Sequence, residues 1–487
     1  MGLVQSVVEP LAARADKVVA RDSDLQLTGG QLLGAMRLIA GRLAGGAGGA
    51  GKVGFLLPNC AAYPALIYGT MWCGRTAVPL NPMLRPNELE FIVADAGIDT
   101  VVYADVTKPL ADALPVTKLS VGELLAPGAA GPQQPAAAGD SDPAVMLYTS
   151  GTSGRPKGVP LTHGNLLSNA RGLIDRAGIN GDDVFLGVLP IFHAFGLTAT
   201  LNLPLLLGAE VTYLPRFTPD RAAAVIGERR VSVFVAVPGM FGLLARSKAP
   251  DEAFASLRLP ICGGEALPAN IRAGFAKRFG RELLEGYGLT ETSPVVAVNL
   301  PAENKPGTVG RLLPGVQARI LHPEDGRSLP AGEEGEIQLR GPGVFSGYHH
   351  RPDENAVAFT ADGWFRTGDL GRLDSDGYLS ISGRIKELII RGGEKVMPRE
   401  IEDVLVQHPG VLEAAVIGEP DGDRGEAVVA FVTPNPAAPP APDELREFCR
   451  GRLADFKVPR RVVVAADLPR GPTGKLLKRA LKDLKPA

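Results

Sequence analysis

Short apolar runs of strand length recur along this chain, and segments with helical periodicity separate them. Three of these runs are residues 144–148, 184–189 and 231–237, which read AVMLY, VFLGVL and VSVFVAV. Continuous apolar runs are typical of buried parallel strands, because helices cover both faces of such a sheet. Between the runs, residues 32–43 repeat an apolar side chain at helical spacing. The alternation predicts an α/β fold built of layers.

The pattern changes within residues 307–382. The stretches GEIQLRG (335–341) and GYLSISG (377–383) alternate polar and apolar residues between glycines. Such stretches favour short antiparallel strands, so we expect a small β region here. Residues 126–142 are rich in Pro, Gly and Ala, which predicts a loop or linker.

A second unit begins near residue 384. A helix is expected from Pro398, strands over 414–418 and 427–433, and a last helix with Asp443 as its N-cap. The sequence therefore predicts a large N-terminal domain of layered α/β subdomains plus a small β region, and a small mobile α+β C-terminal domain. Their expected bounds are 1–382 and 387–487, with a hinge at 383–386.

Composition excludes several classes of protein. The net charge is −2, which gives no overall attraction for nucleic acid. The four cysteines and six histidines show no zinc-binding spacing. The apolar stretch 197–214 contains Asn202, Pro204, Gly208 and Glu210, and a membrane span needs about 20 apolar residues. We expect a cytoplasmic protein without a transmembrane segment; peripheral contact with a membrane stays open.

The strongest local signal is the glycine-rich segment YTSGTSGRPKG at residues 148–158. It follows an apolar run and precedes a helix expected to start near Thr162. Glycines let backbone N–H groups close around phosphate oxygens, and hydroxyls and a lysine add donors and charge. The spacing is not that of a Walker A loop. A polar surface turn is the alternative. The residues expected to bind phosphate are Thr149, Ser150, Gly151, Thr152, Ser153, Gly154 and Lys157.

This segment resembles the signature loop of the adenylate-forming superfamily, which contains acyl-CoA synthetases, peptide-synthetase adenylation domains and beetle luciferases. Further motifs of that superfamily follow in order: GGEA at 263–266, YGLTET at 287–292, WFRTGDL at 364–370, GRIKELI at 383–389 and PRGPTGK at 469–475. The resemblance covers residues 145–478, and it is closest to bacterial fatty acyl-CoA synthetases.

The resemblance implies a two-step reaction. A carboxylate attacks the α-phosphate of ATP to give an acyl-adenylate and pyrophosphate, and the thiol of CoA then takes the acyl group. ATP, Mg²⁺ and CoA are thus the expected cofactors, and a small carboxylic acid is the expected substrate. The expected catalytic residues are Lys475, Glu291, Thr152 and His193, with Glu291 and Thr152 also at the metal.

The resemblance also implies a nucleotide-binding set. Asp369 and Arg384 would contact the ribose, and Lys386 would mark the hinge about which the C-terminal domain rotates. Tyr287 could equally be a core residue. The residues expected to line the adenine and α-phosphate are Gly264, Glu265, Ala266, Glu285, Gly286, Tyr287 and Thr290.

Arg216, Gly392 and Gly393 are expected at CoA, although the two glycines fit a simple hairpin turn as well. The expected walls of the acid pocket are Phe192, His193, Phe195, Val237, Gly263 and Gly288. His193 could gate this pocket or be a satisfied core residue, and the sequence weighs both readings equally.

The expected pocket walls are apolar or small. Diacid-using relatives carry an arginine just before YGxTE, where this chain has Gly286, so a diacid is disfavoured. A medium- or long-chain fatty acid needs only apolar area. Three alternatives stay open: a ligase for an aryl or other small acid, a fatty acyl-AMP ligase that loads an acyl-carrier protein, and a nucleotide-binding protein without catalysis.

Overall fold

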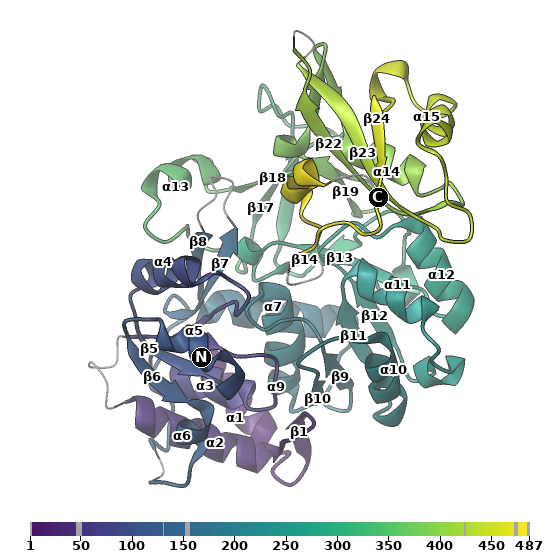
Figure 1. Cartoon of the computed structure of the whole chain (residues 1–487). Helices are drawn as coiled ribbons and strands as arrows, with labels where there is room; N and C mark the ends of the chain where they lie inside the picture. The colour runs from purple at the N-terminus through teal and green to yellow at the C-terminus, as the bar shows by residue number, and fades with distance from the viewer. Residues whose placement is uncertain are drawn as a thin grey trace.

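The protein has a large N-terminal α/β domain and a small β-rich C-terminal domain, as the computed structural model shows (Figure 1). The structure describes residues 2–44, 51–129, 131–150, 156–422, 425–471 and 476–484, with the side chain of residue 150 left out. The C-terminal domain lies at the top of Figure 1, above the edge of the N-terminal domain that carries β13, β14 and α12.

Residues 52–162 contain a six-stranded sheet. Its order is β6-β5-β3-β4-β7-β8; the neighbours pair in parallel except β7 and β8, which form an antiparallel hairpin. The strands are β3 (Lys52–Leu56), β4 (Thr76–Pro79), β5 (Ile98–Tyr103), β6 (Thr117–Ser120), β7 (Pro143–Ser150) and β8 (Pro156–Thr162).

A nine-stranded sheet forms the second layer. Its order is β15-β14-β13-β12-β11-β9-β10-β1-β2, parallel from β13 to β1 and antiparallel at both edges. The strands are β1 (Val18–Arg21), β2 (Gln26–Thr28), β9 (Val184–Gly187), β10 (Glu210–Tyr213), β11 (Val233–Ala236), β12 (Leu259–Cys262), β13 (Leu284–Gly288), β14 (Val295–Val298) and β15 (Arg311–Leu312).

One hydrophobic core connects the two sheets. All ten residues of α3 (Tyr63–Trp72) are buried, as expected of a helix that is apolar on every side. α3 packs on α2 (Gly29–Leu43) and α1 (Leu3–Ala12), and α1 packs on α7 (His163–Ala177) and α9 (Leu203–Leu207). The remaining helices of this domain are α4 (Pro86–Ala96), α5 (Lys108–Asp112), α6 (Val121–Leu125), α8 (Ala194–Leu197), α10 (Pro219–Glu228), α11 (Pro238–Arg246), α12 (Ala269–Phe279) and α13 (Pro352–Ala358).

The small β region and the C-terminal domain have hydrophobic clusters of their own. The β region is an antiparallel sheet in the order β16-β17-β18-β19. These strands are Gln317–Leu321, Gly335–Arg340, Phe365–Leu373 and Leu379–Arg384. The C-terminal domain contains β20 (Ile389–Arg391), β21 (Glu394–Val396), α14 (Pro398–Leu405), β22 (Val411–Pro420), β23 (Glu426–Pro434), α15 (Pro442–Arg450) and β24 (Arg461–Val464).

The structure corrects two local expectations and confirms a third. A second strand that was not expected, β8, follows the glycine-rich segment and pairs antiparallel with β7, before α7 begins at His163 near the expected position. The expected loop is confirmed at residues 126–129 and 131–142, where Trp72 Nε1 donates to the carbonyl of Pro132 at 3.0 Å. The N-cap of α15 is Ala441, since Pro442 takes the first helical position and places Asp443 inside the first turn.

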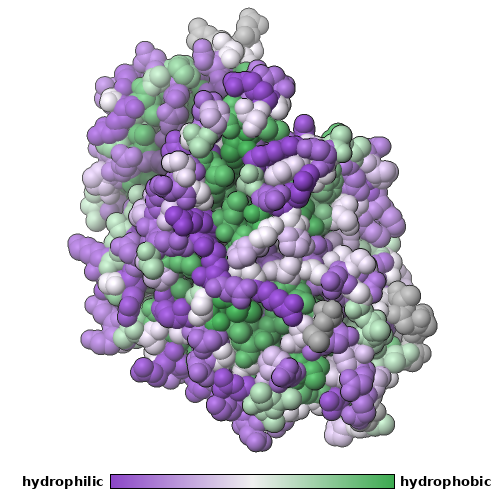
Figure 2. Space-filling model, turned by 180° about the vertical axis from the view of Figure 1, so that it is seen from behind, coloured by the Kyte–Doolittle hydropathy of each residue, from purple (hydrophilic) through white to green (hydrophobic). Residues whose placement is uncertain are grey.

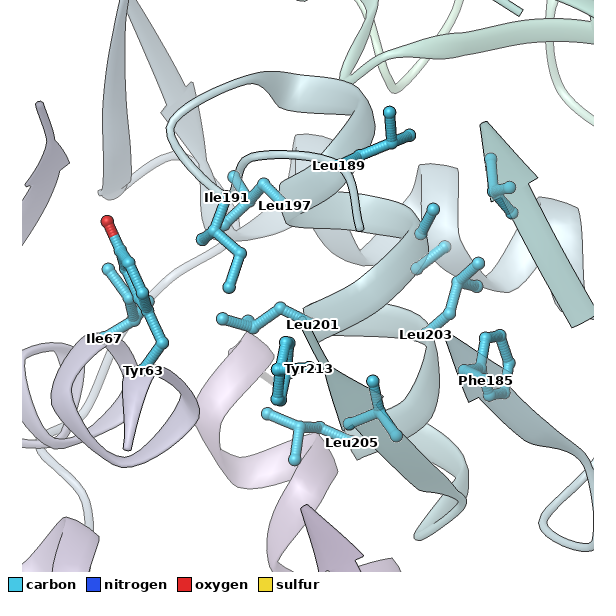
Figure 3. Close-up of a cluster of buried hydrophobic side chains, with 14 of the residues drawn as sticks. Tyr63, Ile67, Phe185, Leu189, Ile191, Leu197, Leu201, Leu203, Leu205 and Tyr213 are labelled. Carbon is cyan, nitrogen blue, oxygen red and sulfur yellow. The ribbon is translucent and has the colours of Figure 1, made fainter. Parts of the chain in front are cut away.

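The apolar stretch 197–214 is folded into the core. It forms the end of α8, a π-helical segment (Thr198–Asn202), α9 and β10. In Figure 3 its side chains Leu197 and Leu201 lie on the side of Tyr63 and Ile67, and Leu203 lies on the side of Phe185. Among the residues that the structure describes, no helix is both long enough and apolar enough to cross a membrane.

Candidate active site

A cleft of about 1530 Å³ extends along the junction of the two domains. Its walls come from α4 and the loop before it, the β7–β8 hairpin, and residues 189–196, 288–291 and 365–368. Val237, Gly264, Pro294 and Tyr348 add to the lining. The C-terminal side closes it with residues 384–386 and with Leu477 and Arg479 of the tail. The face in Figure 2 is mostly hydrophilic, with hydrophobic atoms visible in its recesses.

Cations outnumber anions along this cleft. Among the described residues that line it, six are basic: Arg85, Lys157, Arg366, Arg384, Lys386 and Arg479. The two acidic ones are Glu88 and Glu291. A concave surface with this excess of positive charge attracts a polyanion such as a nucleoside triphosphate.

Lys157 lies at the base of the glycine-rich segment, on β8 opposite Thr149 of β7. Both residues line the cleft. The Lys157 ammonium forms an ion pair with Glu354 of α13 and lies 5.1 Å from the centre of the Tyr348 ring. Burial lowers the pKa of Lys157 from its ordinary value.

Glu291 lies in a short 3₁₀ turn (Thr290–Thr292) directly after β13. The hydroxyl of Tyr348 donates to Glu291 Oε1 at 2.8 Å. Burial, and then the charge of Glu291, raise the pKa of Tyr348, so its hydroxyl remains a hydrogen-bond donor. The second carboxylate oxygen is the one that a metal could use without breaking this bond. Thr290 lines the cleft beside it.

Asp369 is buried and doubly held. Its Oδ1 lies 2.9 Å from Arg384 Nε, and its Oδ2 accepts a hydrogen bond from the Tyr287 hydroxyl at 2.5 Å. Burial and the charge of Asp369 raise the pKa of Tyr287. Arg384 and Lys386 line the cleft, whereas Asp369 and Tyr287 lie behind that wall. The ion pair thus ties Arg384, at the start of the predicted hinge segment, to the neighbouring strand β18.

The turn at 263–266 meets the C-terminal tail. Glu265 Oε1 accepts a hydrogen bond from the backbone N–H of Leu476 at 2.5 Å. The tail is therefore docked on the N-terminal domain at the residue next to Lys475. Gly264 lines the cleft, and Ala266 is exposed beside it.

Glu285 does not line the cleft. It is buried beneath the same turn, where it lies 2.8 Å from Arg272 Nη2 and accepts from the backbone N–H of Leu267 at 3.2 Å. Burial raises its pKa, although Arg399 and Arg272 act in the opposite direction. Its contacts make it a support of the turn rather than a wall of the nucleotide site.

An apolar pocket of about 70 Å³ lies directly behind the cleft. Phe195, Gly264, Gly288 and Pro294 line both cavities and so form the neck between them. The other residues that line the pocket are Leu173, Ile179, Thr198, Ala199, Leu203, Val233, Val235, Ile261, Gly263, Gly286, Tyr287, Val295 and Val298.

Two glycines at or beside the neck leave little room for a side chain, and at Gly288 there is none. A Cβ on Gly263 would lie 3.1 Å from the Phe195 ring, and a Cβ on Gly288 would lie 2.0 Å from the carbonyl oxygen of Pro294. Inside the pocket the two polar side chains are already engaged. The Thr198 hydroxyl donates to the carbonyl of Ser293 at 3.0 Å, and the Tyr287 hydroxyl is bound to Asp369.

Most of the residues predicted for the acid pocket lie at the neck or on its cleft side. Phe192, His193 and Val237 line the cleft, Gly263 lines the pocket, and Phe195 and Gly288 line both. The rings of Phe192 and His193 lie 4.7 Å apart. His193 therefore lies on the cleft side of the pocket entrance.

Several predicted residues are not brought to the cleft. Arg216 is exposed after β10, and Gly392 and Gly393 form the exposed β20–β21 turn with positive φ. None of the three lines the cleft in this domain arrangement. The predicted residues Gly151, Thr152, Ser153, Gly154 and Lys475, and the side chain of Ser150, lie outside the described residues.

Sequence reasoning missed two groups of residues. One comprises the pocket walls Leu173, Ile179, Thr198, Ala199, Leu203 and Val298. The apolar stretch 197–214 contains three of these six residues and was the available signal. The other group is Tyr348 and Glu354, in the segment SGYHHRPDEN (346–355), whose tyrosine and acidic residues among turn-forming residues could have marked it.

These features fit a magnesium nucleotide. A hard cation takes oxygen ligands and completes its shell with phosphate oxygens and water, so one carboxylate such as Glu291 is sufficient. No cluster of three or more His, Cys, Asp or Glu that could hold a metal alone occurs among the residues described. Basic residues around the cleft supply the complementary charge for phosphates.

The comparisons with known proteins agree with this arrangement. Residues 8–349 match the model for "AMP-binding enzyme" and residues 400–475 the model for "AMP-binding enzyme C-terminal domain". A long-chain-fatty-acid–CoA ligase of Bacillus subtilis is 34% identical over 98% of this chain and 94% of that protein. A sulfoacetate–CoA ligase of Cupriavidus necator is 37% identical over 92% and 91%.

Among solved structures, ATP-bound MatB from Rhodopseudomonas palustris superimposes with a TM-score of 0.92 at 33% identity, over 99% of each chain. The apo form of the same protein gives a TM-score of 0.80 over the same coverage. The domain arrangement of this chain is thus nearer to the ATP-bound form.

Proposed function

The chain belongs to the AMP-binding enzyme family, and on that premise we propose that it is an ATP-dependent carboxylic acid–CoA ligase whose acid is an unbranched medium-chain fatty acid. The relatives named above share the activity of an acid–CoA ligase. The choice of a medium-chain fatty acid is specific to this chain and depends on its apolar pocket.

The chain's own residues would act on charge and position. The basic cleft binds the triphosphate, and Glu291 holds Mg²⁺, which neutralises phosphate charge when bound. His193 and Phe195 sit where the carboxylate end of the acid passes from pocket to cleft. Lys475, next to the docked Leu476, would bring its ammonium to the carboxylate and the α-phosphate as the acyl–phosphate bond forms and pyrophosphate leaves.

The observation that carries the choice of acid is the lining of the pocket. None of the described residues that line it is charged, and both polar side chains are engaged elsewhere. A distal carboxylate or sulfonate would be buried there without a partner, which costs several kcal/mol or more. The relatives differ in their acids, so identity with them does not choose between a fatty acid and sulfoacetate, whereas the pocket favours an apolar tail.

The size of the pocket sets an upper limit. An engineered apolar cavity of about 150 Å³ accommodates benzene. A cavity of about 70 Å³ therefore suits a few methylenes beyond the neck and disfavours a bulky aryl group. The expected acyl chain is therefore of medium length, since a long chain would fit only if the pocket opened at its far wall.

Membership of the family supports CoA as the acceptor of the acyl group and a rotation of the C-terminal domain between the two half-reactions. CoA is the acceptor in the names of both relatives, and the carrier-protein alternative finds no support there. We place the hinge at residues 383–386, because the cores on its two sides are separate clusters and Arg384 and Lys386 line the cleft. Rotation there would bring Gly392 and Gly393 to the cleft for thioester formation.

Pyrophosphate release tests this proposal. The protein is assayed with ATP, Mg²⁺ and CoA across straight-chain acids from acetate to oleate, with cinnamate and malonate alongside. We expect kcat/KM to rise with chain length to a maximum at medium length and to fall beyond it. Activity confined to malonate or to cinnamate would overturn the assignment of the acid, and absence of pyrophosphate with every acid would overturn the proposed function itself.

A further inference from the structure

Lys157 of the phosphate site already has an anionic partner from another part of the chain. Its ammonium is paired with the carboxylate of Glu354, on the first turn of α13. The exposed fractions of the two side chains are 16% for Lys157 and 32% for Glu354. The pair is therefore only partly screened by solvent, and any phosphate that binds Lys157 meets this carboxylate at the same nitrogen.

Glu354 has a second cation within reach. Arg351 Nε lies 3.9 Å from Glu354 Oε1, and Arg351 Nη2 lies 3.4 Å from Asp95 Oδ1 on α4. Asp95 in turn accepts a hydrogen bond from the Tyr148 hydroxyl at 2.8 Å. When Lys157 moves to a phosphate, Glu354 keeps Arg351 as a counter-ion, so the exchange leaves no carboxylate buried alone.

The same segment holds the metal-binding carboxylate. Tyr348 donates to Glu291 and stacks beneath Lys157, while α13 begins four residues later and supplies Glu354. The segment 348–354 thus contacts both the anion and the cation that the magnesium nucleotide would use. The two contacts have different effects on charge. Tyr348 donates a hydrogen bond to Glu291 and leaves its negative charge in place, whereas Glu354 neutralises the positive charge of Lys157.

We infer that the Glu354 carboxylate competes with the nucleotide phosphates for the Lys157 ammonium. This competition makes the affinity for MgATP lower than the basic cleft alone would give. This inference rests on the proposed nucleotide site. The same ion pair favours release of pyrophosphate, because Glu354 pairs with Lys157 again as the pyrophosphate leaves. Glu354 is a positioning residue in this account, since it acts through Lys157 and does not touch the reacting atoms.

The test is the dissociation constant of MgATP measured by titration calorimetry for the wild-type chain and for Glu354→Gln. Loss of one partly exposed ion pair corresponds to roughly a three- to fivefold change in affinity, and here the change is a gain because the pair opposes binding. Adenosine, which has no phosphate, should bind both proteins equally.

Asp353→Asn is the matched control. Asp353 precedes Glu354 in the same helical turn and is exposed, so it removes the same charge at almost the same place. We expect its affinity for MgATP to stay near that of the wild type. In a Lys157→Gln background, Glu354→Gln should give no gain, because the cation for which the two anions compete is gone.

Four results would overturn the inference: unchanged or weaker MgATP binding by Glu354→Gln, an equal gain with Asp353→Asn, an equal gain for adenosine, or a gain that persists without Lys157. Wild-type protein that binds no MgATP would instead overturn the proposed function. A thermal unfolding scan accompanies each titration. If Glu354→Gln does not fold, Glu354→Ala is measured in its place.

Discussion

The cleft and the pocket behind it are neighbours with opposite chemistry. The cleft is about twenty times larger, is built from both domains and carries the basic residues. The pocket lies within the N-terminal domain and is lined mainly by apolar side chains from α7, the helical segment 198–203 and strands β11 to β14. They meet only at a neck around Phe195 and Gly288.

This difference separates activation from selection. Phosphate chemistry needs charge, and a polyanion can be met by many side chains from different segments. Selection of an acid by its tail needs a dry surface of fixed shape, where one methylene is worth about 0.8 kcal/mol. Substitutions in the cleft should therefore reduce turnover of every acid alike, and substitutions in the pocket should change the order of acids.

The largest expected effect is that of Lys475→Ala. Removal of one preorganised charge contact costs ~10²–10³ in rate, and it should do so for adenylation alone. Pyrophosphate release is compared with transfer of a supplied acyl-adenylate to CoA, which should stay within a few-fold of the wild type. Lys482→Ala, at an exposed lysine of the same tail, is the control. Equal loss of both half-reactions would contradict this role.

Glu291→Gln should reduce adenylation by about 10², because the carboxylate that holds Mg²⁺ becomes a neutral amide. Since Glu291 lies in the cleft, the fold-loss should be the same for butyrate, hexanoate and octanoate. Glu334→Gln, at an exposed glutamate of the β region, should leave pyrophosphate release unchanged. A loss that depended on chain length would contradict the claim that the cleft activates every acid alike and the pocket alone selects among them.

Ala199→Phe fills the pocket from its helical wall. We expect kcat/KM for octanoate to fall by roughly 10- to 100-fold as the space for several methylenes is lost, while acetate is little changed. Acetate serves as the internal control for folding and for the cleft. Parallel loss with both acids would mean that this cavity does not hold the acyl tail.

The smallest expected effect is that of Ile179→Val, which removes one buried methylene and costs about 0.5–1.5 kcal/mol of stability. The pocket gains room for roughly one methylene, so the ratio of kcat/KM for the next longer acid to the wild-type optimum should rise about fourfold. The readout is the chain-length profile of pyrophosphate release. An unchanged profile would place the end wall of the pocket elsewhere.

The layered α/β fold was predictable because buried strands and amphipathic helices leave periodic patterns in the sequence. The run at 231–237 became β11, and the helical spacing from residue 32 became α2. The order of strands in the nine-stranded sheet was not predictable, since β9, β10 and β1 are brought together by tertiary packing rather than by neighbouring sequence. The matched family confirms the resemblance found in the motifs.

Site residues within motifs were easier to find than those outside them. Glu291 and Arg384 lie in motifs and line the cleft, as expected. Glu285, two residues before the YGLTET motif, was also expected at the nucleotide but is turned away from the cleft, because Arg272 and the backbone of Leu267 bind its carboxylate. The pairing of Glu354 with Lys157 could not be foreseen, since the two residues are nearly 200 positions apart and only the folded chain brings them together.

The most direct test compares two acids of equal length, octanoate and octanedioate, which differ only in the second carboxylate. The account predicts that pyrophosphate release with octanoate exceeds that with octanedioate by at least about 10² in kcat/KM, because the pocket offers the distal carboxylate no counter-charge. Equal rates with the two acids, or a preference for octanedioate, would contradict the claim that a dry, uncharged pocket selects the substrate.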